Sequence, residues 1–209
     1  MLLVTSNPRL AMVARIARIL YTDDPAHGWP HVIRVSRWAS RIVEAERLDV
    51  DLEILALGVI LHDIARNLSL GEHHAIESAR LAKLILETLG YEDHVKQRVE
   101  HIILAHSYSL GLRAETIEAM VLSDADKLDA LGAIGIARVF HTGALMRRSF
   151  EESIEHFKEK ILKLKDMLYF DYSKKVAENL TKRVQEYLAW WEGEQDIRVA
   201  RLPTDNELP

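Results

Sequence analysis

The sequence predicts an all-α protein, because several of its features indicate helices and no segment has the pattern of a strand. Apolar residues recur three and four positions apart through most of the chain, whereas a half-buried strand would alternate apolar and polar residues. Residues that typically start and end helices flank these segments. Aromatic residues, which favour strands, make up only 7% of the sequence. The hydrophobic content of 48% in 209 residues is sufficient for a packed core.

The first half of the chain contains five predicted helices separated by short polar connections. Ser6 or Asn7 can cap the first helix, Asp51 begins the third, and Gly90 ends the fourth. A loop rich in proline and glycine separates the first helix from the second. Each segment repeats its apolar residues with the helical period, so each has a face that can be buried. The predicted ranges are about 8–21, 31–48, 51–63, 74–89 and 92–106.

The second half is also predicted to be helical. A helix that begins at Glu115 keeps its period to Arg138, despite two glycines that each cost about 1 kcal/mol. Residues 141–149 are predicted to form a loop, and two amphipathic helices follow over about 151–168 and 173–191. Residues 194–209 lack periodicity and are predicted to be a flexible tail. We therefore expect one domain over residues 1–209, in which helices over about 150–193 form a C-terminal appendage.

Composition limits the location of the protein and the kinds of site that it can contain. The sequence has no cysteine, so any metal must be bound by histidine, aspartate or glutamate. A net charge of -5 gives no general attraction to nucleic acid or to an anionic membrane. No segment approaches the roughly 18 apolar residues of a membrane span, and the N-terminus lacks the basic leader of a signal peptide. We expect a cytoplasmic protein without a DNA, RNA or membrane partner, and we leave its oligomeric state open.

An adjacent imidazole and carboxylate end the apolar helix predicted over 51–63. Val59 and Ile60 precede His62 and Asp63 at helical spacing, so both polar side chains are directed into the core. A buried carboxylate without a partner costs several kcal/mol, and Asp63 therefore needs a cation, a hydrogen-bond network or a metal ion. A buried His-Asp hydrogen-bonded pair is the alternative to a metal site. These two residues alone do not decide between the alternatives.

Two other positions offer further metal ligands. His31 begins a helix directly after a loop, with Arg34 one turn later on the same face, although a lone histidine there is more often a capping or surface residue. Asp124 and Asp126 lie about 200° apart around their helix, so a single ion can bind only one of them. Helical period does not settle which one binds. Asp124 continues a large apolar face, whereas Asp126 shares a face with alanines that allow close approach of a neighbouring helix, which favours Asp126.

The order of these residues within a helical chain resembles the HD superfamily of metal-dependent phosphohydrolases. More specifically, the motifs are similar to those of a small, largely uncharacterised group of HD-domain hydrolases. A further likeness at Glu155-His-Phe extends the resemblance over nearly the whole chain. The four ordered motifs are His31-x-x-Arg-Val, Leu61-His-Asp-Ile, Ala105-His-Ser-Tyr-Ser and the segment from Asp124-Ala-Asp-Lys-Leu to Arg138.

The resemblance implies an HD-domain helical bundle with additional C-terminal helices, in which the metal-binding core spans about 25–145. The final ligand in the superfamily is the aspartate of an Ala-Asp-Lys-Leu pattern, which is Asp126 here, so that Asp124 has a supporting or structural role. The implied cofactor is a divalent ion, which could be Mn, Mg, Fe, Co or Ni. The implied ligands are His31, His62, Asp63 and Asp126.

Basic and imidazole side chains near these ligands are candidates for binding and catalysis. Lys127 and Arg34 are placed to hold phosphate groups, with Arg66 and Arg138 behind them, and His106 can bind phosphate or relay a proton. His106 also matches, together with His74, the positions that bind a second metal in binuclear members of the superfamily. The sequence leaves open whether one or two metals bind.

The ligand set predicts hydrolysis of a small phosphorylated substrate. Two imidazoles and two carboxylates leave positions for water and a phosphate oxygen on a roughly octahedral ion. We expect a hydrolase of phosphate esters or anhydrides, with nucleotides as the leading substrates. The alternative is a non-catalytic metal- or nucleotide-binding helical module. Members that hydrolyse guanosine tetraphosphate carry an acidic pair where this chain has Arg66 and Asn67, which argues against that substrate.

Overall fold

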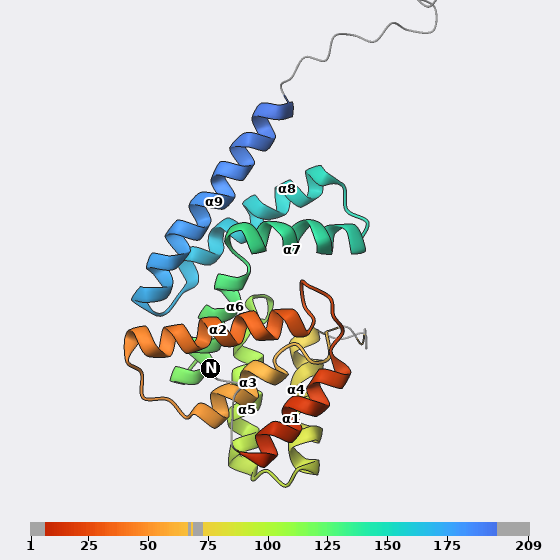
Figure 1. Cartoon of the computed structure of the whole chain (residues 1–209), viewed down its shortest axis with the longest axis vertical. Helices are drawn as coiled ribbons and strands as arrows, with labels where there is room; N and C mark the ends of the chain where they lie inside the picture. The colour runs from red at the N-terminus through yellow and green to blue at the C-terminus, as the bar shows by residue number, and fades with distance from the viewer. Residues whose placement is uncertain (1–6, 67, 69–72, 196–209) are drawn as a thin grey trace, which may run out of the picture.

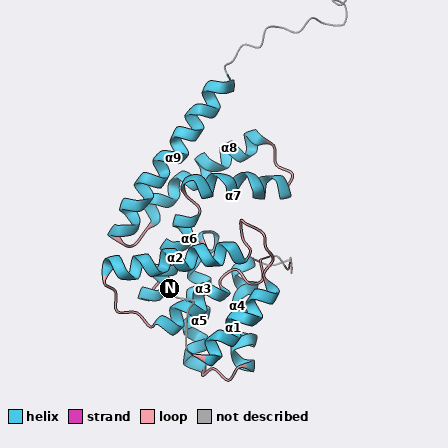
Figure 2. Cartoon of the chain, viewed as in Figure 1, coloured by secondary structure: helices cyan, strands magenta, loops and turns pink. Residues whose placement is uncertain are grey.

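The computed structural model describes residues 7–66, 68 and 73–195, and these residues form helices without any strand (Figure 2). Figure 1 shows two groups of helices, α1 to α6 at one end of the molecule and α7 to α9 at the other. In chain order the elements are α1 (Pro8–Leu20), α2 (Trp29–Glu46), α3 (Leu52–Leu61), α4 (His74–Thr88), α5 (Asp93–His106), the 3-10 helix η1 (Tyr108–Leu110), α6 (Ile117–Asp129), α7 (Gly132–Leu145), α8 (Phe150–Glu159), the 3-10 helix η2 (Ile161–Met167) and α9 (Asp171–Gln195).

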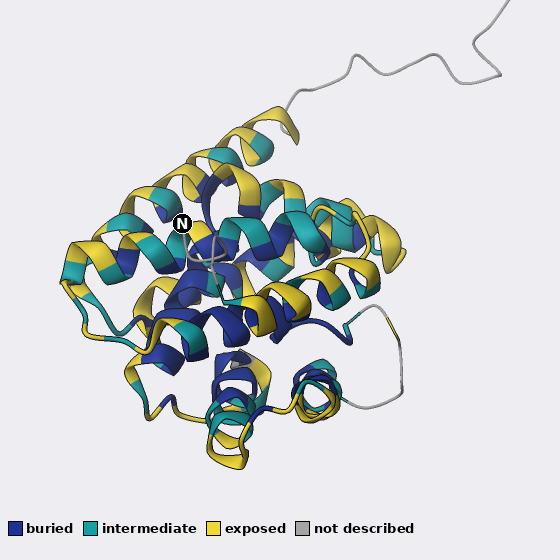
Figure 3. Ribbon diagram, turned by 60° about the horizontal axis from the view of Figure 1, so that its bottom comes forward, coloured by how far each residue is buried: buried dark blue, intermediate teal, exposed yellow. Residues whose placement is uncertain are grey.

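Helix α3 is the centre of the first group. Every residue from Ile54 to Leu61 is buried, as expected of a helix that is apolar on all sides. Helices α1, α2, α5 and α6 all contact it. The contact with α5 is close, because a Cβ atom on Gly58 would lie 2.5 Å from the Cγ2 atom of Ile102. Buried residues gather where the helices meet, and exposed residues cover the outer faces (Figure 3).

The predicted helices of the first half are confirmed to within a few residues. Asn7 caps α1 through its side chain, and Asp51 caps α3 by accepting the Ile54 N–H. Gly90 follows α4 with a φ of 71°, the left-handed conformation that glycine adopts without strain. These ends were predictable because each depends on the local chemistry of one or two residues.

Two predictions for the second half were wrong. The helix predicted from Glu115 to Arg138 is interrupted after Asp129, since Gly132 has a φ of 65° and begins a second helix, α7. The loop predicted over residues 141–149 is helical as far as Leu145. Gly143 lies within that helix at a close contact with α8, where a Cβ atom would lie 2.6 Å from Ser153 Oγ. Packing therefore overrides the weak helix propensity of this segment.

The C-terminal group also differs from the prediction of a single helix over 151–168. That segment divides into α8 and η2 at Lys160, whose φ and ψ of -126° and -58° are not helical. Helix α9 extends to Gln195, and residues 196–209 of the predicted flexible tail lie outside the described residues. An aromatic cluster joins α7, α8 and α9. The ring of Phe140 lies 5.8 to 6.3 Å from the rings of Phe150, Phe157, Tyr187 and Trp191.

Asp124 joins the two groups of helices. Its buried carboxylate on α6 accepts the backbone N–H groups of Tyr169 at 2.9 Å and Phe170 at 3.1 Å, just before α9 begins. Burial raises the pKa of Asp124, although these hydrogen bonds oppose the shift. Asp124 thus has the structural role that the resemblance implied. None of the helices of the described chain has both the length and the apolar composition needed to cross a membrane.

Candidate metal centre

Three imidazoles converge because each lies at the end of a helix that packs in the first group. His31 is in the first turn of α2, His62 follows the last residue of α3, and His106 is the last residue of α5. Each Nδ1 atom contacts an acceptor, which is Asp129 Oδ2 at 2.7 Å for His31, the Val59 carbonyl at 2.9 Å for His62 and the Ile103 carbonyl for His106. These contacts assign the proton to Nδ1 and leave each Nε2 lone pair directed at the centre.

The Nε2 atoms meet at a distance that suits ligands of one ion. His31 Nε2 lies 3.1 Å from His62 Nε2, and with the proton on each Nδ1 no hydrogen bond is possible between them. Two ligands about 2.1 Å from an octahedral ion, at right angles to each other, are about 3.0 Å apart. Asp126 Oδ1 and Asp63 Oδ2 lie 3.3 and 4.0 Å from His31 Nε2. The structure therefore brings together all four predicted metal ligands.

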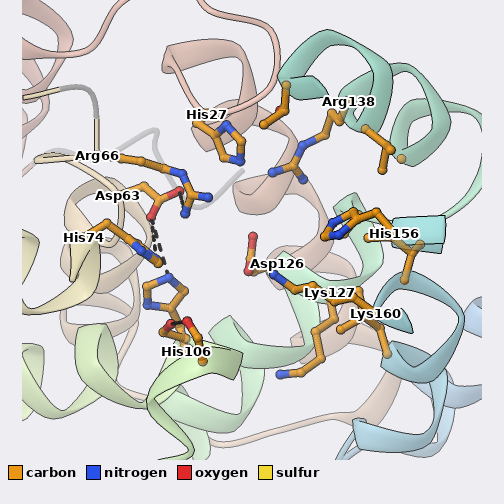
Figure 4. Close-up of a pocket in the computed structure, with 18 of the residues that line it drawn as sticks. His27, Asp63, Arg66, His74, His106, Asp126, Lys127, Arg138, His156 and Lys160 are labelled. Carbon is orange, nitrogen blue, oxygen red and sulfur yellow. Dashed lines mark hydrogen bonds and ion pairs between the residues drawn. The ribbon is translucent and has the colours of Figure 1, made fainter. Parts of the chain in front are cut away.

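Asp63 faces imidazoles through both of its carboxylate oxygens. Oδ2 lies 4.0 Å from His31 Nε2 and 3.5 Å from Arg66 Nη1. Oδ1 lies 3.7 Å from the Nε2 atoms of both His74 and His106 (Figure 4). Asp63 Oδ1 is buried and has no hydrogen-bond partner among the described residues. A buried carboxylate oxygen without a partner is unfavourable unless a cation is bound, so this atom supports a metal site.

Two groups of side chains that share Asp63 have the composition of a metal site. In each group, the ligand atoms of its three residues lie within 4.8 Å of one another. One group consists of His31, His62 and Asp63, and the other of Asp63, His74 and His106.

The ionisation of most of these groups suits metal binding. Burial lowers the pKa of His62 to about 4 and that of His74 to about 3, so both are neutral at pH 7. Burial opposes ionisation of Asp63, but Arg66 and the imidazoles of His106 and His62 outweigh it and hold its pKa well below the usual range. The carboxylate of Asp63 also raises the pKa of His106 against the effect of burial. Neutral imidazole and ionised carboxylate are the forms that bind metal.

A cavity of about 250 Å³ opens beside Asp63 and Asp126. Arg66 and His74 line one side, and Arg138, His156 and Lys160 line the other, with Asp126 between them (Figure 4). Two of the predicted metal ligands, Asp63 and Asp126, therefore border a space that a small ligand can enter.

Comparison with known proteins decides the family. The family model of the HD domain matches residues 28–131, which include all four predicted ligands. YpgQ, an uncharacterised protein of Bacillus subtilis (strain 168), is 33% identical over 172 residues, which are 78% of this chain and 82% of YpgQ. The chain belongs to the HD-domain superfamily. It is a hydrolase of the metal-dependent phosphohydrolase type, and its buried His-Asp group binds a divalent metal.

Solved structures of HD-domain relatives share the fold over nearly the whole chain. The crystal structure of B. subtilis YpgQ in complex with ADP is 28% identical, with a TM-score of 0.69, and covers 89% of this chain and 96% of YpgQ. An HD-superfamily hydrolase from Bacillus thuringiensis is 29% identical, with a TM-score of 0.66, and covers 90% of this chain and 97% of that protein. The C-terminal helices are thus part of the shared architecture.

The three predicted catalytic residues of this HD domain occupy different places. Lys127 lines the cavity, and its ammonium donates to the carbonyl oxygen of Ser123 at 3.2 Å and to the Ser123 hydroxyl. Burial lowers its pKa. His106 also lines the cavity and faces Asp63. Arg34 instead donates to Asp129 Oδ1 and Oδ2 at 2.7 and 3.0 Å, and the same carboxylate contacts the predicted ligand His31.

Asp129 is a residue of the HD site that sequence reasoning missed. Its buried carboxylate accepts from His31, Arg34 and Arg138, which come from two other helices. Burial opposes its ionisation, but the hydrogen bonds from His31 and Arg34 lower its pKa. A signal was present in the sequence, because Asp129 lies three residues after Asp126 and therefore about one turn along the same helix. Helical spacing alone could not reveal that His31 lies opposite.

Proposed function

We propose that this protein hydrolyses phosphate esters or anhydrides of small substrates, with nucleotides as the leading class. The observation that carries the proposal is the cluster of His31, His62, Asp63 and Asp126, whose two carboxylates line a cavity with cationic walls. The same four side chains could also hold a metal that only stabilises the fold. At such a structural site, however, protein groups fill every coordination position of the ion. The open side of this centre favours catalysis.

The four ligands would hold one divalent ion through two neutral imidazoles and two carboxylates. A bound ion supplies an activated water and neutralises charge on the phosphoryl group. Lys127 lines the same cavity and is assigned to a non-reacting phosphate, since one of its three N–H donors is not used by the two contacts to Ser123. His106 faces Asp63 and is assigned to proton transfer or to a second ion.

A second ion is part of the proposal. Asp63 Oδ1, His74 and His106 form a group that shares Asp63 with the first site, and all three residues line the cavity. Since Asp63 Oδ1 has no hydrogen-bond partner in the described structure, an ion there would satisfy it. Two neighbouring ions can stabilise both the attacking and the leaving oxygen of a phosphoryl transfer.

Nucleotides are favoured as substrates because the related YpgQ forms a complex with ADP. The relationship is distant at 28% identity, but it covers 89% of this chain. A non-catalytic nucleotide-binding module remains the alternative, and turnover distinguishes the two.

The test is turnover by the purified full-length chain after its metal has been removed and individual divalent ions restored. The substrates are a nucleotide panel and bis(p-nitrophenyl) phosphate, with product analysis to identify the broken bond. We expect hydrolysis that requires metal and that is lost in His62→Ala. Metal binding without turnover of any phosphate compound would favour the binding module, and activity that persists without metal would contradict the hydrolase proposal.

A further inference from the structure

The cavity has a cationic wall that the metal chemistry does not require. Among the described residues, five cationic side chains line it together with the carboxylates of Asp63 and Asp126. Three of the five come from the C-terminal group, beyond the residues matched by the HD family model. The five are Arg66, Lys127, Arg138, Arg148 and Lys160.

The three cationic residues of the C-terminal group lie in α7 and at the two breaks that separate α7, α8 and η2. Arg138 is in α7, Arg148 is in the connection between α7 and α8, and Lys160 is at the junction of α8 and η2. We name Arg138, Arg148 and Lys160 the distal wall, because Figure 4 shows the labelled members on the opposite side of Asp126 from Asp63 and His74. If one end of a substrate is bound at the metal ligands, its other end therefore lies near the distal wall.

The cations lie close enough to repel one another. Burial lowers the pKa of Lys160, and Arg66, Arg138 and Arg148 lower it further, while Asp126 opposes them. Burial also lowers the pKa of the neighbouring His156, to which Lys160 and Arg148 add. Like charges gathered around a concave space raise the local concentration of anions and favour their binding. A divalent ion at the metal centre adds positive charge to the same space.

A single phosphate at the metal centre would not use both sides of this cavity. Arg138 donates Nη1 to Asp129 at 2.8 Å, which leaves most of its five N–H donors for another acceptor. Guanidinium groups match the paired oxygens of phosphate, and ammonium groups bind it as point charges. The chemistry of the wall thus suits phosphate oxygens that extend away from the metal.

We propose that the distal wall binds the non-reacting end of a substrate that carries a chain of two or more phosphates. The inference rests on the proposed function, since it places the reacting phosphate at the metal ligands. Arg148 and Lys160 hold the far phosphate, and Arg138 spans the distance between it and the metal centre. The enzyme therefore prefers phosphoanhydrides such as nucleoside di- and triphosphates over monophosphate esters.

The experiment measures binding to the metal-loaded full chain by calorimetry, with inorganic phosphate and the non-hydrolysable diphosphate analogue methylenediphosphonate as probes. We expect the diphosphonate to bind at least about 10-fold more tightly, because a hydrogen bond to a charged group contributes about 1.5–3 kcal/mol. Arg148→Ala and Lys160→Ala should each reduce this preference about 10-fold or more. Lys160→Arg, which keeps the charge, should retain most of it.

Lys163→Ala is the matched control, because Lys163 is exposed and lies in η2 only three residues from Lys160. It should keep the wild-type preference. A preference that survives in both Arg148→Ala and Lys160→Ala, or that is lost equally in Lys163→Ala, overturns the inference. Metal content of each variant verifies that the centre is intact.

Turnover separates this inference from the proposed function. If the chain hydrolyses no phosphate compound but loses its preference in the two alanine variants, the hydrolase proposal fails and the distal wall stands. If it hydrolyses nucleotides, and both Arg148→Ala and Lys160→Ala keep the preference for the diphosphonate, the hydrolase proposal stands and the distal-wall inference is overturned.

Discussion

His31 Nδ1 lies 2.7 Å from Asp129 Oδ2, and both side chains are shielded from solvent. Arg34 and Arg138 hold the same carboxylate from two other directions, so Asp129 cannot turn away from the imidazole. A carboxylate in this position fixes the tautomer and the orientation of a ligating histidine and makes it a stronger base. Asp129 is therefore a positioning residue for the metal centre.

Asp129→Asn tests this role with little change in size. We expect metal affinity to fall about 10- to 100-fold, the usual effect of changing a group that orients a ligand. Metal titration of the purified variant measures it, and Asp166→Asn, at an exposed position of η2, is the matched control. An unchanged metal affinity in Asp129→Asn would contradict the positioning role.

Asp124 and Asp126 should differ sharply although they are two residues apart. Asp126→Ala should abolish metal binding at the site that it forms with His31, because it removes a carboxylate next to that imidazole. Asp124→Ala should retain the metal but lower the stability by about 1–3 kcal/mol, since the N–H groups of Tyr169 and Phe170 lose their acceptor. Metal content and thermal unfolding distinguish the two, and loss of metal only in Asp124→Ala would reverse the assignment.

Lys127→Ala should reduce turnover without releasing the metal. A protonated ammonium cannot coordinate an ion, and the loss of a charge-assisted phosphate contact should lower kcat/KM roughly 10- to 150-fold. Steady-state kinetics with metal content determined on the same sample measures the effect. Kinetics equal to those of the wild type would remove the phosphate-binding role from Lys127.

The shared carboxylate of Asp63 predicts the metal stoichiometry. If the group of Asp63, His74 and His106 binds a second ion, elemental analysis of the wild type should give about two metals per chain. His74→Ala should lower this to about one, whereas His62→Ala removes a ligand of the first site. One metal per chain in both the wild type and His74→Ala would restrict the centre to a single ion.

The residues near each helix end show how far the sequence could predict the fold. Asn7, Asp51 and Gly90 act through their own backbone neighbourhood, and the helices that they bound were predicted. Gly143 looked like a helix breaker, but its close contact with Ser153 is a property of two packed helices that local sequence does not contain. Helix ends that depend on neighbouring residues could be predicted from the sequence, whereas features that depend on contacts between distant helices could not.

The same distinction holds within the site. His62 and Asp63 stand out because polar residues at the end of an apolar helix require a partner. The contact of His31 with Asp129 spans 98 positions, and no spacing rule connects them. Arg148 and Lys160 carried no recognisable pattern, because they meet at one cavity only through the breaks between α7, α8 and η2.

The left-handed turn at Gly132 determines how close Arg138 comes to the metal centre. In one uninterrupted helix, residue 138 would lie nine positions along the axis from Asp129, or about 13.5 Å away. The turn instead changes the direction of the chain, and Arg138 Nη1 lies 2.8 Å from Asp129 Oδ2. The ligands precede this turn, and the distal wall follows it. Substrate preference can thus diverge among relatives through α7, α8 and η2 while the residues that bind the ion stay as they are.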